Sequence, residues 1–383
     1  MALFCVLATL FLVAAIIYII VGYPLLLMRL SRTKGRGPDK RYELKTVSML
    51  ICAYNGEKFL AEKLESVVSV DYPRELMQVF VLSDGSTDRT VDIARQFVDR
   101  GIQVVELPRG GKPAALNHGL TLCTGEILII TDVRQTLERS SIRELVACFA
   151  DPTIGVVSGD LPMRKGVDSE ESNTSLYWRY EREIRKCLGR LGSTFGATGP
   201  FYGMRRVLAK PMSPSTLLDD MFLPLKAYFQ GYRVIVDETA RALEYPFTMK
   251  SEFTRKVRTQ AGVYQIMQIY PELLSPKKNP LLFHFVSYKI GRLALPWLFL
   301  LLLIVSFGLP WPLWWLMVGA QIAFYLTAAM DTMLPEGFLL KKITAPARAV
   351  VVMLAAAAVA VRVFFVAPER LWVVTQARHR GKT

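Results

Sequence analysis

The stretch Glu126-Ile-Leu-Ile-Ile-Thr-Asp-Val-Arg134 decides the fold class of this chain. A continuous apolar run of strand length that ends at an acidic residue is typical of a buried central strand, which would deliver Asp132 to the edge of a sheet. Ligands of open α/β sheets bind beyond the carboxyl ends of the strands, so a carboxylate there can meet a metal ion, a ribose or a sugar hydroxyl. Capping of the next helix is the alternative role for Asp132 taken alone.

Strand and helix patterns alternate along the chain around this stretch. Strands are expected over 46–53, 78–83, 102–107, 127–131 and 155–160, and helices over 57–70, about 88–99, 113–122 and 175–190. Such alternation predicts an α/β fold with a mostly parallel, Rossmann-like sheet and helices on both faces. Asn55 and Asp84 each follow one of these strands, so both are expected to lie with Asp132 along one edge of the sheet.

Several apolar stretches are long enough to cross a bilayer. Residues 2–28 are nearly free of charge and lack the cleavage site of a secretory signal, so they are expected to remain as an anchor. Further spans are expected over 293–309, 311–330 and 345–365, although the last contains Arg348 and Arg362. The chain is therefore expected to be an integral membrane protein.

The net charge of +14 is concentrated beside these apolar stretches. Seven Lys or Arg residues lie within 29–45, directly after the first stretch, and others flank the later ones. This distribution fits the positive-inside rule and contact with anionic lipid, so the domain between the spans is expected to face the cytoplasm. Nucleic-acid binding would favour a basic stripe with interleaved aromatic residues, and the soluble part shows no clear one.

The cysteine and histidine residues provide no sign of a disulfide framework or an imidazole metal site. The five cysteines have no paired spacing, so buried free thiols are expected, in agreement with a cytoplasmic domain. The three histidines are too scattered along the chain to form a metal site of imidazole ligands.

Four polar motifs follow one another between residues 52 and 134. They read Cys-Ala-Tyr-Asn-Gly at 52–56, Ser-Asp-Gly-Ser-Thr-Asp at 83–88, Gly-Lys-Pro-Ala-Ala-Leu-Asn at 111–117 and Thr-Asp-Val-Arg at 131–134. In order and spacing this series resembles the nucleotide-sugar motifs of family 2 glycosyltransferases, which have the GT-A fold. The resemblance implies that the nucleotide sugar is held by Tyr54, Asn55, Asp84 and Lys112, with Asp132 at the donor diphosphate and sugar.

One residue departs from the pattern of that family. The usual Asp-x-Asp motif ends in a carboxylate that binds Mg²⁺ or Mn²⁺, whereas this chain has Arg134 at that position. Arginine cannot ligate a cation, but it can neutralise a diphosphate directly. Two readings therefore stay open: Asp132 holds the metal together with another group, or Arg134 takes over part of the metal's role.

The acceptor side and the catalytic base are expected in the second half of the soluble domain. The turn-rich segment 196–203, with Thr198 and Gly199, resembles the acceptor site of the family, and Trp178 is a candidate for stacking on a sugar ring. The segment Leu-Leu-Asp-Asp-Met at 217–221 resembles the acidic motif that supplies the base of inverting transfer. By its position that base is Asp220, with Asp219 as the second choice and helix capping as the structural alternative.

The segment 253–259 occupies the place of the Gln-x-x-Arg-Trp motif of processive polysaccharide synthases, but only Arg258 matches. A cationic contact of Arg258 with the leaving diphosphate is expected. The predicted organisation is a transmembrane anchor over 1–28, a basic linker over 29–45, a cytoplasmic GT-A domain over 46–275, an interfacial amphipathic segment over 276–292, transmembrane segments over 293–368 and a basic tail over 369–383.

The resemblance predicts a membrane-bound inverting transferase of the bacterial plasma membrane. It would move a sugar, expected to come from a UDP-sugar, onto a lipid-linked or surface-glycan acceptor. A processive synthase of the hyaluronan, cellulose or poly-N-acetylglucosamine type is the alternative enzyme. A catalytically silent sensor or scaffold that binds nucleotide sugars is the alternative from another class, and Arg134 is the residue that favours it.

Overall fold

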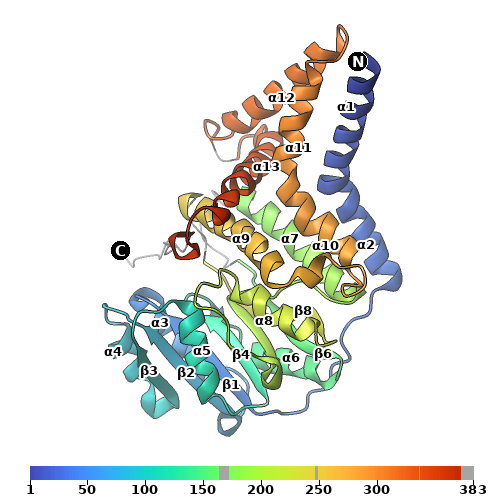
Figure 1. The fold of residues 1–383 in the computed structure, drawn as a ribbon. Coiled ribbons are helices and arrows are strands. Elements are labelled where there is room, and N and C mark those ends of the chain that lie inside the picture. Colours follow the sequence, from blue (N-terminus) through green and yellow to red (C-terminus); the bar gives the residue numbers. More distant parts are fainter. Residues whose placement is uncertain (164–171, 246–248, 336, 372–383) are drawn as a thin grey trace. The chain divides into compact units, whose positions relative to one another are not determined.

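The structure is a computed structural model that describes residues 1–163, 172–245, 249–335 and 337–371 (Figure 1). The chain divides into two compact units, which are described separately. The helical unit comprises Met1–Arg32, Val167–Ile184 and Met249–Thr375, and the α/β unit comprises Thr33–Gly166, Arg185–Thr248 and Gln376–Thr383.

The α/β unit is built on one eight-stranded sheet. Its strands are β1 Val47–Ala53, β2 Met77–Asp84, β3 Ile102–Leu107, β4 Ile127–Asp132, β5 Thr136–Leu137, β6 Ile154–Asp160, β7 Phe201–Arg205 and β8 Arg233–Leu243. They are arranged in the order β3-β2-β1-β4-β7-β6-β8-β5. The first four in this order are parallel to one another, as expected. The apolar runs of β1, β2 and β4 are buried on both faces, whereas in β3, at the edge of the sheet, only Ile102 is buried.

Helices cover both faces of this sheet, and the alternation of side chains along each strand divides the core in two. The helices are α3 Glu57–Val68, α4 Thr90–Arg95, α5 Lys112–Leu122, α6 Ser141–Ala147 and α8 Asp219–Tyr228. Ile127 and Ile129 of β4 pack with residues of α3 and α6 in one cluster, whereas Leu128 and Ile130 pack with residues of α5 and α8 in the other. The central strand is therefore buried on both sides, as its sequence predicts.

The second half of the sheet differs from the expected one in two respects. The segment 196–203, expected to be a loop, runs into β7 from Phe201 onward, and β7 is antiparallel to β4. Strand β8 was not expected, because its centre, Asp-Glu-Thr-Ala-Arg at 237–241, interrupts the apolar pattern. It is nevertheless parallel to β6, which supplies its hydrogen-bond partners and its buried neighbours. Tertiary pairing thus outweighs the local pattern in this half.

Part of the predicted basic linker packs on the α/β unit. The Lys40 ammonium lies 2.8 Å from both the Glu144 and the Asp237 carboxylates, and Lys45 lies 2.8 Å from Glu126. These two charges of the linker are therefore paired within the protein. The fit of the other basic residues of the linker to anionic lipid stays a prediction.

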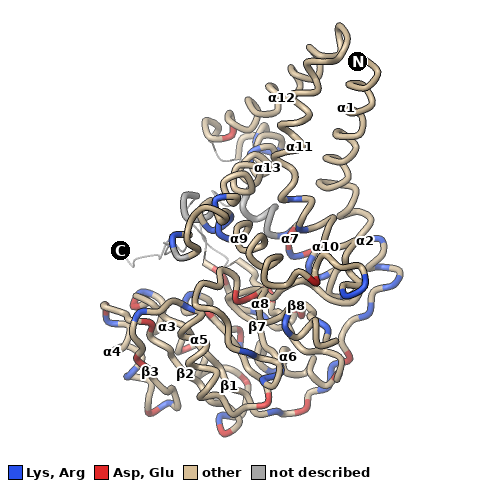
Figure 2. The backbone as a smooth tube through the Cα atoms, viewed as in Figure 1, with Lys and Arg blue, Asp and Glu red and all other residues tan. Residues whose placement is uncertain are grey.

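Among the residues that the structure describes, the helical unit has four helical stretches that are long and apolar enough to cross a membrane. They span Ala2–Lys34, Leu282–Ser306, Leu313–Met330 and Lys341–Phe364, close to the four stretches expected from the sequence. The first combines α1 Ala2–Ile17, a π-helical turn Tyr18–Gly22 and α2 Tyr23–Lys34. The others are α10 Leu282–Phe285 with a π-helical turn Val286–Ile290 and α11 Gly291–Ser306, then α12 Leu313–Met330, then α13 Lys341–Ala360. Figure 2 shows that α1 carries no charged residue along its whole length.

Polar contacts join the π-helical turns within this unit. The Tyr18 and Ser287 hydroxyls are 2.8 Å apart, and Glu181 of α7 Ser172–Leu191 contacts both Tyr288 and Arg292. Burial would raise the pKa of Glu181, but Arg292 and its other cationic and hydrogen-bonding partners outweigh burial and lower it to about 2. Helix α9 Met249–Ile269 packs against α13 in the same unit.

Candidate active site

The centre of the candidate active site is the carboxyl end of β4. Asp132 is the last residue of β4 and pairs in register with Cys52 of β1, while Ile130 pairs with Tyr202 of β7. Because side chains two residues apart on a strand share one face, Asp132, Cys52 and Tyr202 face the side of the sheet that α5 and α8 cover. Three adjacent strands and the first turns of two helices therefore meet at this point.

Lys112 connects the two acidic motifs at this point. It is the first residue of α5, and its ammonium lies 2.9 Å from Asp132 Oδ1 and 3.1 Å from Asp219 Oδ2. Its side chain is only 16% exposed. Burial by itself would lower the pKa of Lys112, but the Coulombic attraction of Asp132 and Asp219 is stronger and raises it. Lys112 is therefore a permanent cation that bridges two carboxylates separated by 87 positions in the sequence.

The predicted base and the predicted acceptor segment lie against each other. Asp219 and Asp220 begin α8, and the Ala197 amide donates a hydrogen bond of 2.7 Å to the Asp220 carbonyl. A Cβ added to Gly199 would lie 2.8 Å from Asp220 Oδ2, so this glycine permits close approach to the carboxylate. The structure thus brings Gly199 to the side chain of Asp220, while their roles as acceptor segment and base stay predictions.

The same segment is fixed to the donor motif at its other end. The Asp132 amide and the Thr131 hydroxyl both donate to the Pro200 carbonyl, at 3.1 and 2.8 Å. The Thr198 amide donates to Ser158 Oγ over 2.8 Å, and the two hydroxyls are 2.9 Å apart. The segment 196–200 therefore lies between Asp132 and Asp220 and is held to both by backbone contacts.

The Tyr202 hydroxyl was not singled out by the sequence. Its side chain is fully buried, and among the described residues its hydroxyl has no hydrogen-bond partner. Burial, and then the charges of Asp219 and Asp220, raise the pKa of Tyr202 well above its usual value. A neutral phenol with a free O–H is thus placed next to the acidic cluster, where it could donate a hydrogen bond to a ligand.

The predicted nucleotide residues Tyr54 and Asp84 are joined by Arg109. Asp84 is buried and accepts hydrogen bonds from the Gly110 and Gly111 amides at 2.7 and 3.0 Å. The Arg109 guanidinium pairs with Asp84 and lies 3.7 Å from the centre of the Tyr54 ring. Arg109 was not among the site residues expected from the sequence, because its contacts come from two other loops.

Asn55 holds the first two loops of this edge together. It has a positive φ of 48°, and its side-chain oxygen accepts the Thr87 amide at 2.9 Å. The Asn55 amide in turn donates to Ser86 Oγ at 3.2 Å. Asparagine tolerates this left-handed conformation better than most residues. In the described structure Asn55 thus orders the loops, and its predicted contact with the nucleotide stays a prediction.

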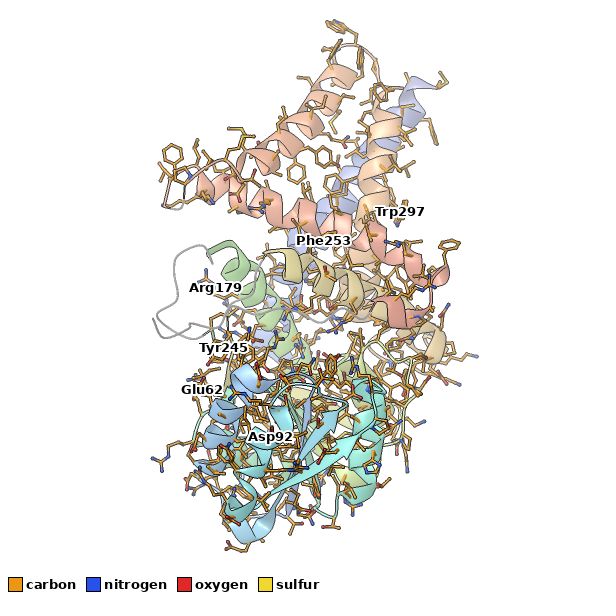
Figure 3. The ribbon with its side chains drawn as sticks, turned by 90° about the vertical axis from the view of Figure 1, so that its left-hand side faces the viewer. Glu62, Asp92, Arg179, Tyr245, Phe253 and Trp297 are labelled. Atoms are coloured by element: carbon orange, nitrogen blue, oxygen red, sulfur yellow. The ribbon has the colours of Figure 1, made fainter. Side chains whose placement is uncertain are left out.

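A buried network supports the Asp132 turn from the other face of the sheet. The ammonium of Lys63 donates to Thr131 Oγ1 and to the Gln135 carbonyl, both at 2.7 Å. Gln135 Nε2 donates at 2.8 Å to both carboxylate oxygens of Glu244. The Tyr245 hydroxyl donates to Glu62, and these two side chains lie close together in Figure 3. The residues that flank Asp132 are therefore fixed by buried polar contacts.

Two predicted site residues are not tested by this geometry. Arg258 lies on α9 of the helical unit, so its predicted contact with the leaving diphosphate stays a prediction. Trp178 lies on α7, and its side chain is outside the described residues. The site described above therefore includes neither Arg258 nor Trp178.

The mixed α/β sheet with its covering helices is a fold of the GT-A type. In comparisons with known proteins, residues 48–211 match the family model described as glycosyl transferase family 2. The fold matches the solved structure of mannosyltransferase PcManGT from Pyrobaculum calidifontis in complex with GDP-Man and Mn²⁺, with a TM-score of 0.72 and 22% identity, over 94% of this chain and 99% of that one. The match to glycosyltransferase family 2 thus covers 164 of the 383 residues, and these include all four motifs.

Curated relatives agree with this assignment. A probable glycosyltransferase of Bacillus subtilis, YdaM, is 23% identical over 273 residues, which are 67% of this chain and 64% of the relative. The beta-monoglucosyldiacylglycerol synthase of Synechocystis sp. is 26% identical over 298 residues, which are 71% of this chain and 60% of the relative. The matches thus span less than two thirds of the length of these relatives.

The residues at the donor motif do not form a metal site of the expected kind. Among the described residues there is no group of three His, Cys, Asp or Glu side chains that could hold a metal ion. Asp132 is the carboxylate kept from the family motif, and it already pairs with Lys112, while Arg134 stands where the second carboxylate is expected. A divalent ion bound to Asp132 would lie beside an ammonium group and be repelled by it. The donor set therefore does not fit a resident Mg²⁺ or Mn²⁺.

Proposed function

We propose that this chain is a membrane-bound inverting glycosyltransferase that moves a sugar from a nucleotide-sugar donor, most simply a UDP-sugar, to a lipid-linked or surface-glycan acceptor. The observation that carries the proposal is the cluster of Asp132, Lys112, Asp219 and Asp220 at one point of the sheet edge. Support comes from the match of residues 48–211 to the family 2 model and from the similarity to a relative named for glycolipid synthesis.

The donor is proposed to lie along the loops that follow β1, β2 and β4. The Tyr54 ring and the Asp84 carboxylate are suited to the base, which offers a π face and N–H donors. Lys112 and Arg134 are suited to the diphosphate, because charge-assisted hydrogen bonds to phosphate oxygens are the strong ones. Bound there, the sugar would extend from Asp132 toward the segment 196–200.

Asp220 is proposed to be the general base. Its carboxylate takes the proton of the acceptor hydroxyl as that oxygen attacks the anomeric carbon. The bond between this carbon and the diphosphate oxygen breaks, and the nucleoside diphosphate leaves with the bonding electrons from the opposite face, which inverts the configuration. Asp220 lies in the first turn of α8, where the helix dipole favours the ionised carboxylate that a base requires. Asp219, held by Lys112, is then free of that role.

The helical unit is proposed to anchor the enzyme in a bacterial plasma membrane with the α/β unit in the cytoplasm. Four stretches have the length and hydropathy of spans. The Lys and Arg residues that flank them, among them Lys277, Lys278, Lys341 and Lys342, fit the positive-inside rule. Anchoring would hold the enzyme next to a lipid-linked acceptor.

The proposal is tested by release of nucleoside diphosphate from the full chain in native lipid. A panel of UDP-sugars with GDP-mannose is incubated with lipid extract, and Asp220→Asn is compared with the wild type. Loss of a general base is expected to lower kcat by about 10²–10⁴-fold, with nucleotide affinity unchanged. Asp92→Asn, an exposed residue on α4 labelled in Figure 3, is the matched control and is expected to keep full activity.

The two alternative functions give different results in the same assay. A processive synthase would release one nucleotide per sugar and yield a long polymer, whereas a single transfer stops at one product. A silent sensor would bind nucleotide with no release from any donor, and Asp220→Asn would then change nothing. Release that survives Asp220→Asn would contradict the assigned base and move the role to Asp219.

A further inference from the structure

We infer that Lys112 is the resident cation of the donor site, so that this chain binds the donor diphosphate through Lys112 and Arg134 without a bound divalent ion. The inference rests on the proposed function and deepens it. It concerns how the charge of the donor is neutralised in this particular chain.

The ammonium group of Lys112 lies where a metal ion would be expected. Lys112 Nζ lies 2.9 Å from Asp132 Oδ1, the carboxylate that the family motif would offer to a metal, and 3.1 Å from Asp219 Oδ2. An ion that binds two carboxylates from different motifs does what this ammonium already does. The cation position is thus filled by the chain itself.

The charges around that position also differ from those of a metal-binding motif. Arg134 stands in place of the second metal-binding carboxylate, which removes one negative charge from the motif and adds a positive one. Among the described residues no third acidic or imidazole side chain completes a metal site. Two cationic side chains, Lys112 and Arg134, therefore lie at the motifs of this chain. A metal-dependent motif has a second carboxylate and a metal ion instead.

The side chains of Lys112 and Arg134 also match what the reaction needs at the leaving group. Departure of a nucleoside diphosphate needs positive charge at the phosphate oxygens, and arginine and lysine can supply it as a metal does. A bound diphosphate would draw Lys112 away from Asp132 or share it with Asp219. The single side chain of Lys112 would then contact both the donor diphosphate and the acidic motif.

The test measures binding apart from turnover. The full chain in lipid nanodiscs is stripped with EDTA, and the affinity for UDP and GDP is measured by calorimetry with and without Mn²⁺. Binding of Mn²⁺ itself is followed by electron paramagnetic resonance. We expect EDTA to change the nucleotide affinity by less than twofold, and the wild type to show no saturable Mn²⁺ signal in the presence of nucleotide.

Two substitutions sharpen the outcome. Arg134→Asp restores the acidic pair and is expected to produce a saturable Mn²⁺ signal that the wild type lacks. Lys112→Met is expected to weaken nucleotide binding at least tenfold in the absence of metal. Lys45→Met is the matched control, because Lys45 is 18% exposed and pairs with Glu126, yet lies at the opposite end of the same strands. It is expected to leave both readouts unchanged.

Each remaining outcome counts against the inference. Nucleotide binding that requires Mn²⁺, or saturable Mn²⁺ binding by the wild type with nucleotide, would overturn it while leaving the proposed function intact. The same holds if Lys112→Met and Lys45→Met bind nucleotide equally well. If no nucleotide binds in either the presence or the absence of metal, the proposed function fails and the inference fails with it.

Discussion

Two enclosed lysines lie on opposite faces of the sheet next to the same β4 turn, and their surroundings differ. Lys63 is 0% exposed and donates only to neutral groups, Thr131 Oγ1 and the Gln135 carbonyl. Lys112 is 16% exposed and lies between two carboxylates. Burial lowers the pKa of Lys63 to about 7, whereas the carboxylates outweigh burial and raise the pKa of Lys112.

The difference shows that nearby charges, more than burial, decide what a buried lysine can do. With neutral partners, Lys63 can lose its proton near neutral pH and acts as a hydrogen-bond donor that supports the turn. With two anionic partners, Lys112 keeps its proton throughout the physiological range and acts as a fixed positive charge. Lys63 is therefore a structural residue, whereas Lys112 belongs to the candidate site.

The largest expected effect is the pH dependence that Lys63 imposes on stability. Its pKa is about 7 in the folded chain, against 10.5 for a free lysine. Between these values the unfolded chain binds more protons, so folding becomes more favourable as the pH rises from 7 to 10.5. The gain is at most about 5 kcal/mol. Denaturant unfolding of the full chain in detergent at several pH values should show this rise in the wild type and not in Lys63→Met.

Other titrating groups are common to both proteins and cancel in the difference. If the free energy of unfolding has the same pH dependence between 7 and 10.5 in the wild type and in Lys63→Met, burial does not lower the pKa of Lys63. The contrast between Lys63 and Lys112 then fails.

A second effect is expected for Lys112→Met. It leaves Asp132 and Asp219 close together without their cation, and loss of one partner of a largely buried ion pair costs about 3 kcal/mol. Denaturant unfolding at pH 7 measures the loss. Adding Asp219→Asn removes one of the two stranded charges and should recover part of it, so a double variant less stable than Lys112→Met would refute the bridge.

A smaller effect is expected for Thr131→Val. It removes the hydroxyl that accepts from Lys63 and donates to the Pro200 carbonyl, with little change in side-chain volume. An unsatisfied buried group costs about 1 kcal/mol or more in stability. Thermal unfolding should rank the wild type and Thr131→Ser together above Thr131→Val. Equal stability of all three proteins would mean that the Lys63 contact contributes nothing.

The smallest effect is expected for a third lysine, Lys45. Its partner Glu126 is 49% exposed, so solvent screens the pair and its loss in Lys45→Met should cost only about 0.5 kcal/mol. Raising the salt concentration should reduce even this difference. A loss as large as that of Lys112→Met would show that exposure of the partner does not separate the two ion pairs.

Much of the sheet edge could be predicted from the sequence. Strands β1, β2 and β4 contain continuous apolar runs bounded by polar turns, so their ends, and with them Asp84 and Asp132, follow from local pattern alone. The antiparallel β7 and the strand β8 could not be predicted in the same way. Their patterns are short or interrupted, and their partners lie far away in the sequence.

The sequence by itself determined the α/β class and the order of the motifs, and with them the resemblance to family 2 glycosyltransferases. These properties depend on short stretches of chain, whose apolar period and turn residues are read directly. Only the tertiary structure decided which charges meet: Lys112 with Asp219 and Arg109 with Asp84, whereas Lys63 donates to the neutral Thr131 hydroxyl and Gln135 carbonyl. Charge interactions act over a few ångströms in space, whatever the separation along the chain, and these distances exist only once the sheet has formed.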